Sequence, residues 1–312
     1  MTTIFDTNAC TCLRKRGVFL IAILSLLSLM TAYGRAAEKV EKYDVTGILL
    51  KLDRSQQTMT VSCESIPGHM DAMVMSFAVR NPKALDGLHP GVRIAFTLVE
   101  GKDSFYADDV QARPFDSLEL DPTAARRLKL LENLMASPSP AARPLAVGQR
   151  VPEFSLTDQK RQRVTLSDLA GKVVAVTFVY TRCPFPNYCF RMSNNFGQLQ
   201  TRFKKRLGEE LVLLTVVIDP THDQPEALAD YARIWKADPS AWHFLTGPLP
   251  AIQQLARNFD MNFYPDEALF VHSFHTVIID RQGKLAANLE GNDFTAQQLG
   301  DLVEAVLAGS ND

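Results

Sequence analysis

Cysteine is scarce in this sequence, and most chain segments have none. Five cysteines occur in 312 residues, and only Cys183 and Cys189 stand close together in a segment that could be exported and folded. A Cys-x-x-Cys pair of the thioredoxin type is absent. No cysteine follows the N-terminal apolar run closely enough to carry a lipoprotein anchor. The net charge of −2 and the lack of a basic stripe argue against a nucleic-acid partner.

The N-terminal apolar run is too short for an ordinary membrane-spanning helix. Residues 18–30 are apolar, whereas a spanning helix needs about 20 such residues. Basic residues 14–16 precede the run, and small residues follow it. This pattern predicts a secretory signal over residues 1–37, with an uncleaved membrane anchor as the alternative. We therefore expect a bacterial periplasmic protein, in a compartment where disulfides can form.

The next region has the short strands and frequent turn signals of a small all-β domain. Residues 43–113 contain about five short strand patterns separated by turn signals, with no helical period. This spacing predicts a small OB-like barrel, which we place in residues 38–114. A linker is expected over residues 115–146, with helical spacing at 122–134 and a Pro- and Ser-rich tether at 136–144.

From residue 147 to residue 312 the pattern alternates between strands and helices. Two near-continuous apolar strands are expected at 173–180 and 211–218, as in a sheet covered on both faces. Helices are expected at 192–207, 225–235, 251–259 and 295–307, with a hairpin at 276–289. This order predicts an α/β domain of the thioredoxin-like type.

The close cysteine pair follows the first of these strands and precedes a helix. Partial positive charge at a helix N-terminus lowers the pKa of a thiol and favours the thiolate. Cys183 and Cys189 are six positions apart, so an ideal helix would separate their sulfurs. Pro184 and Pro186 prevent such a helix, and a turn that folds back can bring the sulfurs together. We expect the pair to act as metal ligands or as a redox-active disulfide.

Four pieces of sequence then give this region a specific resemblance. They are residues 148–156 with Gly171-Lys172, Thr181-Arg182-Cys183-Pro184 with Cys189, Val217-Ile218-Asp219-Pro220 with Asp223, and His272-Ser273 eight residues before Asp280. Residues 147–308 thereby resemble the Sco (SenC) family, thioredoxin-like copper chaperones that serve cytochrome c oxidase assembly. The resemblance implies that Cys183, Cys189 and His272 are copper ligands. The family usually has three residues between its cysteines and a proline after the second, whereas this chain has five and then Phe190.

Two histidines compete for the role of the imidazole ligand. Two thiolates with one imidazole suit both Cu(I) and Cu(II). His272 and His275 are three positions apart, so on one extended strand they would point to opposite faces. The family resemblance favours His272, which leaves His275 behind the ligands or on the surface. We interpret His222 as a loop residue and His243 as structural.

One acidic residue near the pair also has two interpretations. Asp219 ends the second buried strand, so its carboxylate could orient a metal ligand. The alternative is a turn or helix-capping aspartate.

Methionines gather at a second place in the sequence. Met70, Met73 and Met75 lie within six residues, next to His69. Met73 and Met75 are two positions apart, so they share one face of a strand. Thioether sulfur is a soft ligand suited to Cu(I), but methionine is also a common core residue.

Together with the barrel pattern, this cluster resembles the periplasmic CusF-like copper-binding domain. That family binds its metal through a histidine and two methionines, with an aromatic residue as a cap. By the resemblance Met73 and Met75 are the two methionine ligands, and Met70 stands in the place of the aromatic cap. Cys63 lies near the place of the family's histidine. Either His69 or Cys63 is then the third ligand.

These observations favour a periplasmic copper chaperone with an accessory Cu(I) domain. A copper-receiving protein, such as a cytochrome c oxidase subunit, would be its partner. The flexible linker would raise the effective concentration of one site for the other. The alternative is a thiol-disulfide oxidoreductase that reduces the cysteines of a target copper site, with a thioredoxin-like reductant as a partner. A third hypothesis, a peroxidase-like enzyme, lacks a peroxidase signature around Cys183.

Overall fold

The computed structural model describes residues 40–102, 104–115, 122–135 and 143–309. The expected signal or anchor at residues 1–37 and most of the Pro- and Ser-rich tether lie outside the described residues. Within the described residues, no helix combines the length and apolar character needed to span a membrane.

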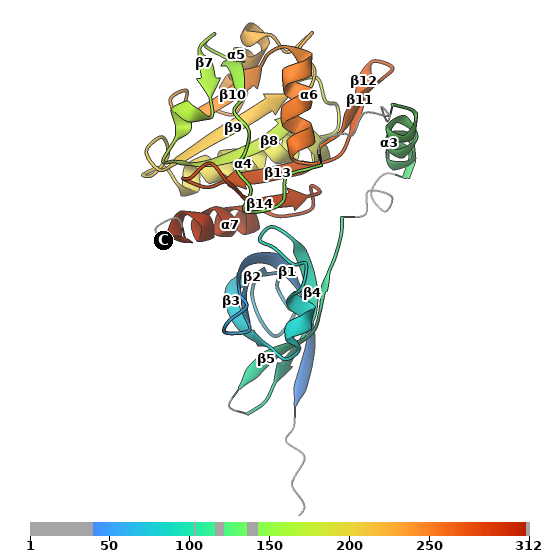
Figure 1. The fold of residues 1–312 in the computed structure, drawn as a ribbon, viewed down its shortest axis with the longest axis vertical. Coiled ribbons are helices and arrows are strands. Elements are labelled where there is room, and N and C mark those ends of the chain that lie inside the picture. The colour runs from blue at the N-terminus through green and yellow to red at the C-terminus, as the bar shows by residue number, and fades with distance from the viewer. Residues whose placement is uncertain (1–39, 103, 116–121, 136–142, 310–312) are drawn as a thin grey trace, which may run out of the picture. The chain divides into compact units, whose positions relative to one another are not determined.

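The N-terminal region forms a five-stranded closed barrel, as the sequence predicted (Figure 1). Its strands are paired in the order β1-β2-β3-β5-β4. Their bounds are β1 Glu41–Asp53, β2 Thr58–Cys63, β3 Met73–Val79, β4 Arg93–Glu100 and β5 Phe105–Ala112, with a short 3₁₀ helix η1 at Pro82–Leu85. Alternate residues of each strand face the interior, where Leu49, Met59 and Phe77 are fully buried. The helix expected in the linker is present as α3, Pro122–Met135.

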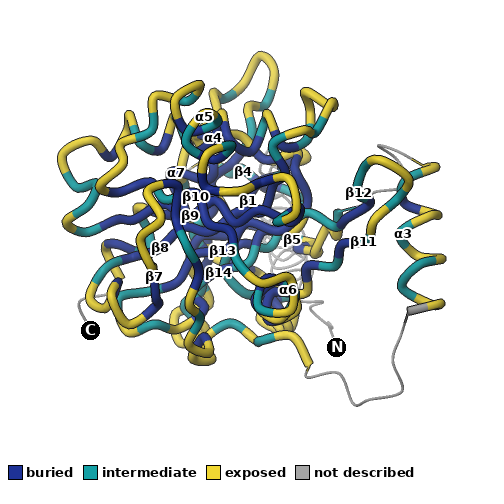
Figure 2. The backbone as a smooth tube through the Cα atoms, turned by 90° about the horizontal axis from the view of Figure 1, so that it is seen from above, coloured by how far each residue is buried: buried dark blue, intermediate teal, exposed yellow. Residues whose placement is uncertain are grey.

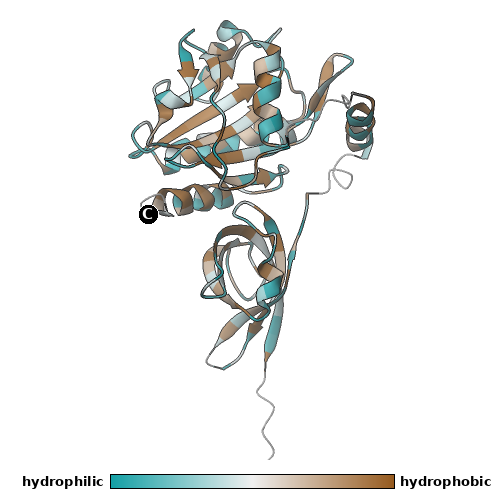
Figure 3. Cartoon of the chain, in the orientation of Figure 1, coloured by the Kyte–Doolittle hydropathy of each residue, from teal (hydrophilic) through white to brown (hydrophobic). Residues whose placement is uncertain are grey.

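The C-terminal region is built on a seven-stranded sheet with the order β14-β13-β8-β9-β10-β6-β7. The strands are β6 Ser155–Asp158, β7 Arg163–Thr165, β8 Val173–Val179, β9 Leu211–Val217, β10 Trp242–Thr246, β13 His275–Ile279 and β14 Leu285–Glu290. Every residue of β8 and β9 is buried, so the central strands are dark in Figure 2 and largely hydrophobic in Figure 3. This fits the expectation of a sheet covered on both faces.

Helices cover the two faces of this sheet. Their bounds are α4 Arg191–Arg202, α5 Pro225–Ile234, α6 Leu249–Asn258 and α7 Ala296–Gly309, with a short 3₁₀ helix η2 at Ser167–Leu169 and a single π-helical turn η3 at Pro186–Phe190. On one face of β8, Thr177 meets Thr276, whose hydroxyl donates to Met192 of α4. On the other face, Phe178 contacts Phe259 at the end of α6. The result is the predicted thioredoxin-like α/β fold.

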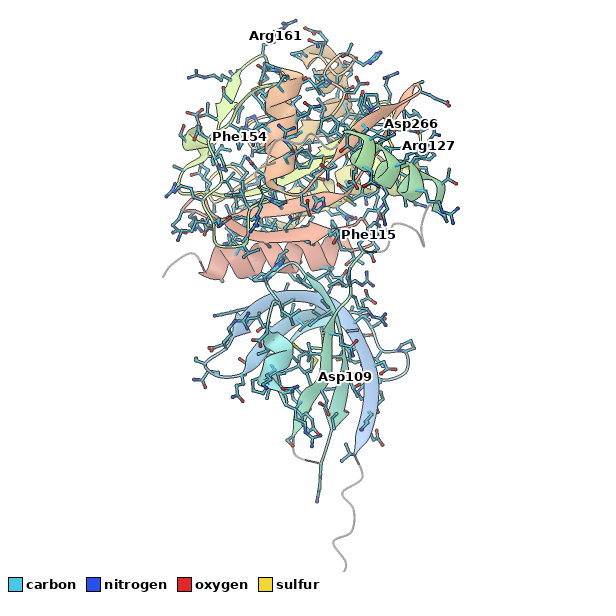
Figure 4. All side chains as sticks on the ribbon, turned by 45° about the vertical axis from the view of Figure 1, so that its right-hand side comes forward. Asp109, Phe115, Arg127, Phe154, Arg161 and Asp266 are labelled. Atoms are coloured by element: carbon cyan, nitrogen blue, oxygen red, sulfur yellow. The ribbon has the colours of Figure 1, made fainter. Side chains whose placement is uncertain are left out.

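A separate two-stranded hairpin follows α6 and was not predicted. Its strands are β11 Phe263–Asp266 and β12 Leu269–His272. Pro265 stands within β11, and a proline in a short run is usually a sign against a strand. β10 and the β6–β7 hairpin were also missed. In Figure 4 the labelled Arg161 marks the β6–β7 turn, where its side chain pairs with Glu226 of α5.

One helix is shorter than its periodicity indicated. We expected a helix to residue 207, but α4 ends at Arg202, and Phe203 is its C-cap. Phe203 still packs into the core, and the backbone N–H of Leu207 donates to the carbonyl of Phe203 in the following turn. The apolar spacing therefore continues beyond the helix because the turn keeps the same face buried.

Candidate thiol and metal site

The cysteine pair lies in the segment of residues 180–190, which we call the thiol loop. After β8 the chain turns at once, and the backbone N–H of Cys183 donates to the carbonyl of Tyr180 over 3.2 Å. The π-helical turn η3 then leads directly into α4, with Tyr188 in a non-helical conformation (φ −109°, ψ −110°). The prediction of a non-helical spacer is therefore only partly confirmed, because the chain turns after Tyr180 but Pro186 begins a helical turn that continues into α4.

The two sulfurs of the loop interact but have different surroundings. The three cysteines of the described residues are free thiols. Cys183 is partly exposed, and the hydrogen bond from the Cys189 side chain lowers the pKa of its thiol to about 6, helped by backbone hydrogen bonds. Cys189 is only 2% exposed, and burial raises the pKa of its thiol well above the ordinary value. At neutral pH the pair holds one thiolate, on Cys183, and one thiol proton.

A buried carboxylate fixes the start of the thiol loop. Asp223 is fully buried and accepts from both the backbone N–H and the hydroxyl of Thr181, 42 residues earlier in the chain. Burial raises the pKa of Asp223, while the bonds from Thr181 lower it. Asp223 thus ties the thiol loop to the segment that follows β9.

A second carboxylate holds the residue beside Cys183. Asp219 accepts from the guanidinium of Arg182 over 2.7 Å and from the Nδ1 of His222 over about 3.1 Å. Burial acts to raise the pKa of Asp219, but the hydrogen bonds from Arg182 and His222 outweigh it and hold the pKa below its usual value. The sequence allows two roles for Asp219, to orient a metal ligand or to stabilise a turn. The backbone carbonyl of Asp219 also accepts from the N–H of Asp223. Asp219 therefore stabilises this turn in addition to holding Arg182.

The candidate imidazole ligand lies at the end of β12. His272 is buried, and its Nδ1 lies 2.8 Å from the carbonyl oxygen of Ser273. A carbonyl oxygen can only accept, so Nδ1 carries the proton and Nε2 keeps its lone pair. Burial lowers the pKa of His272 to about 4, although the Ser273 bond opposes this. A neutral imidazole with Nε2 free is the form that binds a metal.

Aromatic rings surround His272 on the side of the thiol loop. The ring of Tyr180 meets it edge-on at 6.2 Å, and the ring of Phe274 lies 4.6 Å away. Phe274 in turn contacts Tyr188 at 5.0 Å, inside the thiol loop. Within the ranges that the structure describes, no three Cys, His, Asp or Glu side chains stand close enough to hold a metal ion. The triad of Cys183, Cys189 and His272 therefore stays a prediction.

The position of His275 differs from the one that the sequence predicted. We expected His272 and His275 on opposite faces of one strand, but they belong to β12 and β13, in different sheets. The surface interpretation of His275 is wrong, because it is buried and its Nδ1 lies 3.0 Å from the side-chain oxygen of Asn288. His243 pairs with Asp158 and is structural, and His222 is in a loop, as predicted.

The methionines of the barrel stand at one end of β3. Met73 is 46% exposed, and Met75 is partly buried. Met73 is the direct partner of Cys63 on β2, and Met75 is the direct partner of Val61. Direct partners project to the same face of a sheet, and this face carries the buried Val61 and Cys63. The two methionines are thus interior-facing residues at the open end of the barrel.

The other candidate ligands of the barrel lie in a tight turn before β3. Ile66 and Met70 pair across this turn, and Gly68 takes a positive φ of 75° that favours glycine. His69 is exposed and stacks on Tyr43 at a ring separation of 3.8 Å. Cys63, in contrast, is 1% exposed, and burial raises the pKa of its thiol to about 12.

Sequence reasoning missed two contributors to the thiol loop. Asp223 belongs to a motif of the sequence, but the bonds of its carboxylate to Thr181 depend on two loops that meet in the fold. Tyr180 ends the apolar run of the strand, where an aromatic residue resembles an ordinary core residue. The only sequence signal for it is its position three residues before Cys183.

The fold and the thiol loop define a thioredoxin-like protein with a hydrogen-bonded cysteine pair between a central strand and the next helix. The family model described as SCO1/SenC matches residues 144–307, more than half of the chain, and the chain belongs to this family. A second model, described as copper binding periplasmic protein CusF, matches residues 42–111, which contain the barrel. The family matches support copper as the metal of this chain.

Curated relatives resemble part of the chain. A putative copper-binding protein of Stutzerimonas stutzeri is 27% identical over 146 residues, which cover 45% of this chain and 68% of the relative. Protein sco1 of Schizosaccharomyces pombe is 25% identical over 154 residues, which cover 47% of this chain and 56% of that protein. The chain thus spans between about half and two thirds of the length of these relatives.

Solved structures also resemble the C-terminal region. ScoI of Arabidopsis thaliana with copper bound has a TM-score of 0.45 at 22% identity, covering 51% of this chain and 98% of that one. A SCO1/SenC family lipoprotein from Bacillus anthracis has a TM-score of 0.47 at 24% identity, covering 53% of this chain and 99% of that one.

Proposed function

We propose that this protein is a copper chaperone that binds copper through Cys183, Cys189 and His272. Thiolate and imidazole are the ligands that Cu(I) and Cu(II) share, so this set would hold copper in either state. Membership of the SCO1/SenC family supports the role. His272 lies on β12, outside the seven-stranded sheet, so the hairpin would have to bring Nε2 to the sulfurs when the metal binds.

The observation that carries the proposal is a pair of free thiols, Cys183 and Cys189, in the turn between β8 and α4. Metal binding requires both thiols to lose their protons. Cys183, with a pKa of about 6, offers a thiolate at neutral pH, and Cys189 would give up its proton to the incoming metal. The charge of the metal would replace the proton that the two sulfurs share.

We further propose that the barrel holds an accessory Cu(I) site built on Met73 and Met75. Met70 would take the place where the family has an aromatic cap, and either Cys63 or His69 would supply the third ligand. The cross-strand pairing of Cys63 with Met73 supports Cys63. The stacking of His69 on Tyr43 holds that imidazole at the turn. Residues 115–146 would tether the two sites.

The partner and the location are part of the same proposal. Copper would pass to a receiving protein such as a cytochrome c oxidase subunit. The periplasm is supported by the basic-apolar pattern at residues 1–37 and by the match to a periplasmic copper-binding family. That N-terminal segment would be either a cleaved signal or a membrane anchor.

Anaerobic copper titration of the reduced protein tests the ligand set. We expect two equivalents of Cu(I), one in each region. His272→Ala should weaken Cu(II) binding while the Cys183–Cys189 disulfide still forms on oxidation. His222→Ala is the matched control, because His222 is an exposed histidine beside the same loop. An unchanged Cu(II) affinity and spectrum in His272→Ala would refute the assignment.

The second candidate function is reduction of the cysteines of a target copper site. The contrast between Cys183 and Cys189 favours it, since a partly exposed thiol of lowered pKa beside a buried thiol is the arrangement of a reactive redox pair. In this role Cys183 attacks the target disulfide and Cys189 resolves the mixed disulfide, leaving the chain oxidised and the target reduced. A thioredoxin-like reductant would restore the pair. A disulfide-reductase assay in which His272→Ala keeps full activity would favour this function over the first.

A further inference from the structure

Tyr180 is buried at the point where the thiol loop leaves β8. Its side chain is 1% exposed, and its carbonyl accepts the backbone N–H of Cys183. It lies two residues after Phe178, so it projects to the same face of the sheet, the face on which Phe178 meets Phe259. The β11–β12 hairpin follows α6 on that face. Tyr180 therefore lies between the thiol loop and the hairpin.

The phenol of Tyr180 contacts both neighbours. Burial raises the pKa of its hydroxyl most, the nearby side chain of Cys183 raises it further, and the nearby backbone of Phe270 in β12 lowers it. Its ring lies 5.6 Å from the ring of Phe270 and meets the ring of His272 edge-on at 6.2 Å. One side chain thus touches a thiol of the pair and the strand that carries the candidate imidazole ligand.

The register of the hairpin explains why the backbone of Phe270 is available. β11 and β12 are joined by a two-residue loop, so the closing pair Asp266 and Leu269 exchanges both backbone hydrogen bonds. The next pair, Pro265 and Phe270, is then a pair without hydrogen bonds between its members. This position suits Pro265, which has no N–H, and it turns the N–H of Phe270 outward. The N–H of Phe270 can therefore donate to the phenol oxygen, which leaves the phenol proton for sulfur.

We propose that Tyr180 is a positioning residue that latches the His272 hairpin to the thiol loop. The N–H of Phe270 donates to the oxygen of Tyr180, and the hydroxyl of Tyr180 donates to the sulfur of Cys183. Phe270 and His272 project to the same face of β12, so the latch fixes the strand two residues from the imidazole. The metal-related part of this inference rests on the proposed copper function. The latch itself does not.

Tyr180→Phe removes the hydroxyl and keeps the ring, so packing against Phe270 and His272 is retained. The matched control is Tyr231→Phe, because Tyr231 is also a well-packed tyrosine but its hydroxyl bonds to Ser193 at 2.9 Å. The first measurement is amide hydrogen exchange of Phe270 in the full, reduced, metal-free chain. We expect exchange at least tenfold faster in Tyr180→Phe, and within about twofold of the wild type in Tyr231→Phe. Equal protection in all three proteins would overturn the latch.

The second measurement is the Cu(II) complex of the same three proteins. We expect Tyr180→Phe to bind Cu(II) about tenfold more weakly, as loss of one hydrogen bond to a charged sulfur predicts, with a shifted sulfur-to-copper absorption band. The Tyr231→Phe complex should match the wild type. An unchanged band and affinity in Tyr180→Phe would overturn the role in positioning the ligands. If the wild type binds no copper, the proposed function fails, and the exchange experiment still decides the latch.

Discussion

The thiol loop and the methionine end of β3 both gather soft sulfur atoms, but their surroundings differ. Two carboxylates hold the segment around the cysteines, Asp219 through Arg182 and Asp223 through Thr181. Met73 and Met75 instead depend on strand pairing, with Cys63 and Val61 as their cross-strand partners. One region is held by charged and polar side chains, and the other by sheet register.

This difference follows from the chemistry of the two kinds of sulfur. A thiol must lose a proton before it binds a metal, whereas a thioether is neutral and binds without any proton transfer. The thiol loop therefore needs hydrogen-bond donors that stabilise an anion, and Cys189 and backbone groups supply them to Cys183. The methionines need only an open position at the barrel end. Cys63 is the exception in the barrel, since its buried thiol would have to lose a proton to the metal.

The largest expected effect compares the thiols of the two regions. In the reduced, metal-free protein, iodoacetamide should modify Cys183 at least about 100-fold faster than Cys63 at pH 7, because burial raises the pKa of Cys63 to about 12. The pKa of Cys183 is lowered to about 6, so its thiolate is present above that pH and is lost as the pH falls through it. The rate should be level above pH 7 and halved near pH 6.

Peptide mass spectrometry at timed intervals assigns each modified cysteine. Cys183→Ser serves as the control, and it should remove the fast phase completely. A midpoint near pH 9 for Cys183 would show that the loop leaves its thiol unperturbed, and the contrast with the barrel would then rest on exposure alone.

The next prediction concerns the barrel end. Replacing Met73 and Met75 together with leucine should lower the Cu(I) stoichiometry from two equivalents to one, because both soft ligands are lost while apolar volume is retained. Met59→Leu is the control, since Met59 is a fully buried barrel residue whose cross-strand partner is Phe77 and not either methionine. Competition with a chromophoric Cu(I) chelator measures the stoichiometry. Retention of both equivalents in the double variant would return these methionines to a packing role.

The third prediction tests the polar support of the thiol loop. Asp223→Ala leaves the N–H and hydroxyl of Thr181 without their buried acceptor, so we expect unfolding free energy to fall by about 2–3 kcal/mol. Asp230→Ala is the control, because Asp230 is an exposed residue of α5 that pairs with the exposed Arg233. Urea unfolding of both variants measures the difference. A loss below about 0.5 kcal/mol in Asp223→Ala would show that the loop is held by other contacts.

The sequence predicted the parts of this site that depend on local pattern. The apolar run of β8 and the shared face of Met73 and Met75 both follow from spacing and residue type. The β11–β12 hairpin was missed because Pro265 interrupts its pattern.

Contacts between distant segments could not be predicted in the same way. Asp223 reaches Thr181 across 42 residues, and Tyr180 meets Phe270 only because the hairpin packs on the face of β8 that Tyr180 occupies. No periodicity reports which side chains meet when two loops come together at one end of a sheet. The residues that support the thiol loop therefore came from the fold, and the candidate ligands came from the sequence.

The smallest expected effect concerns the partly exposed ion pair of the thiol loop. Arg182→Gln removes the guanidinium from Asp219, but the Arg182 side chain is 43% exposed, and solvent screens such a pair. We expect a loss of about 1 kcal/mol or less, falling further in high salt, since His222 still donates to Asp219. Urea unfolding at low and high ionic strength measures it, with Arg233→Gln, from a fully surface pair, as the control. A loss of unfolding free energy as large as that of Asp223→Ala would mean that Asp219 and Asp223 support the thiol loop as one network. The methionine end of β3, which depends on strand pairing, would then differ from the thiol loop in this respect as well.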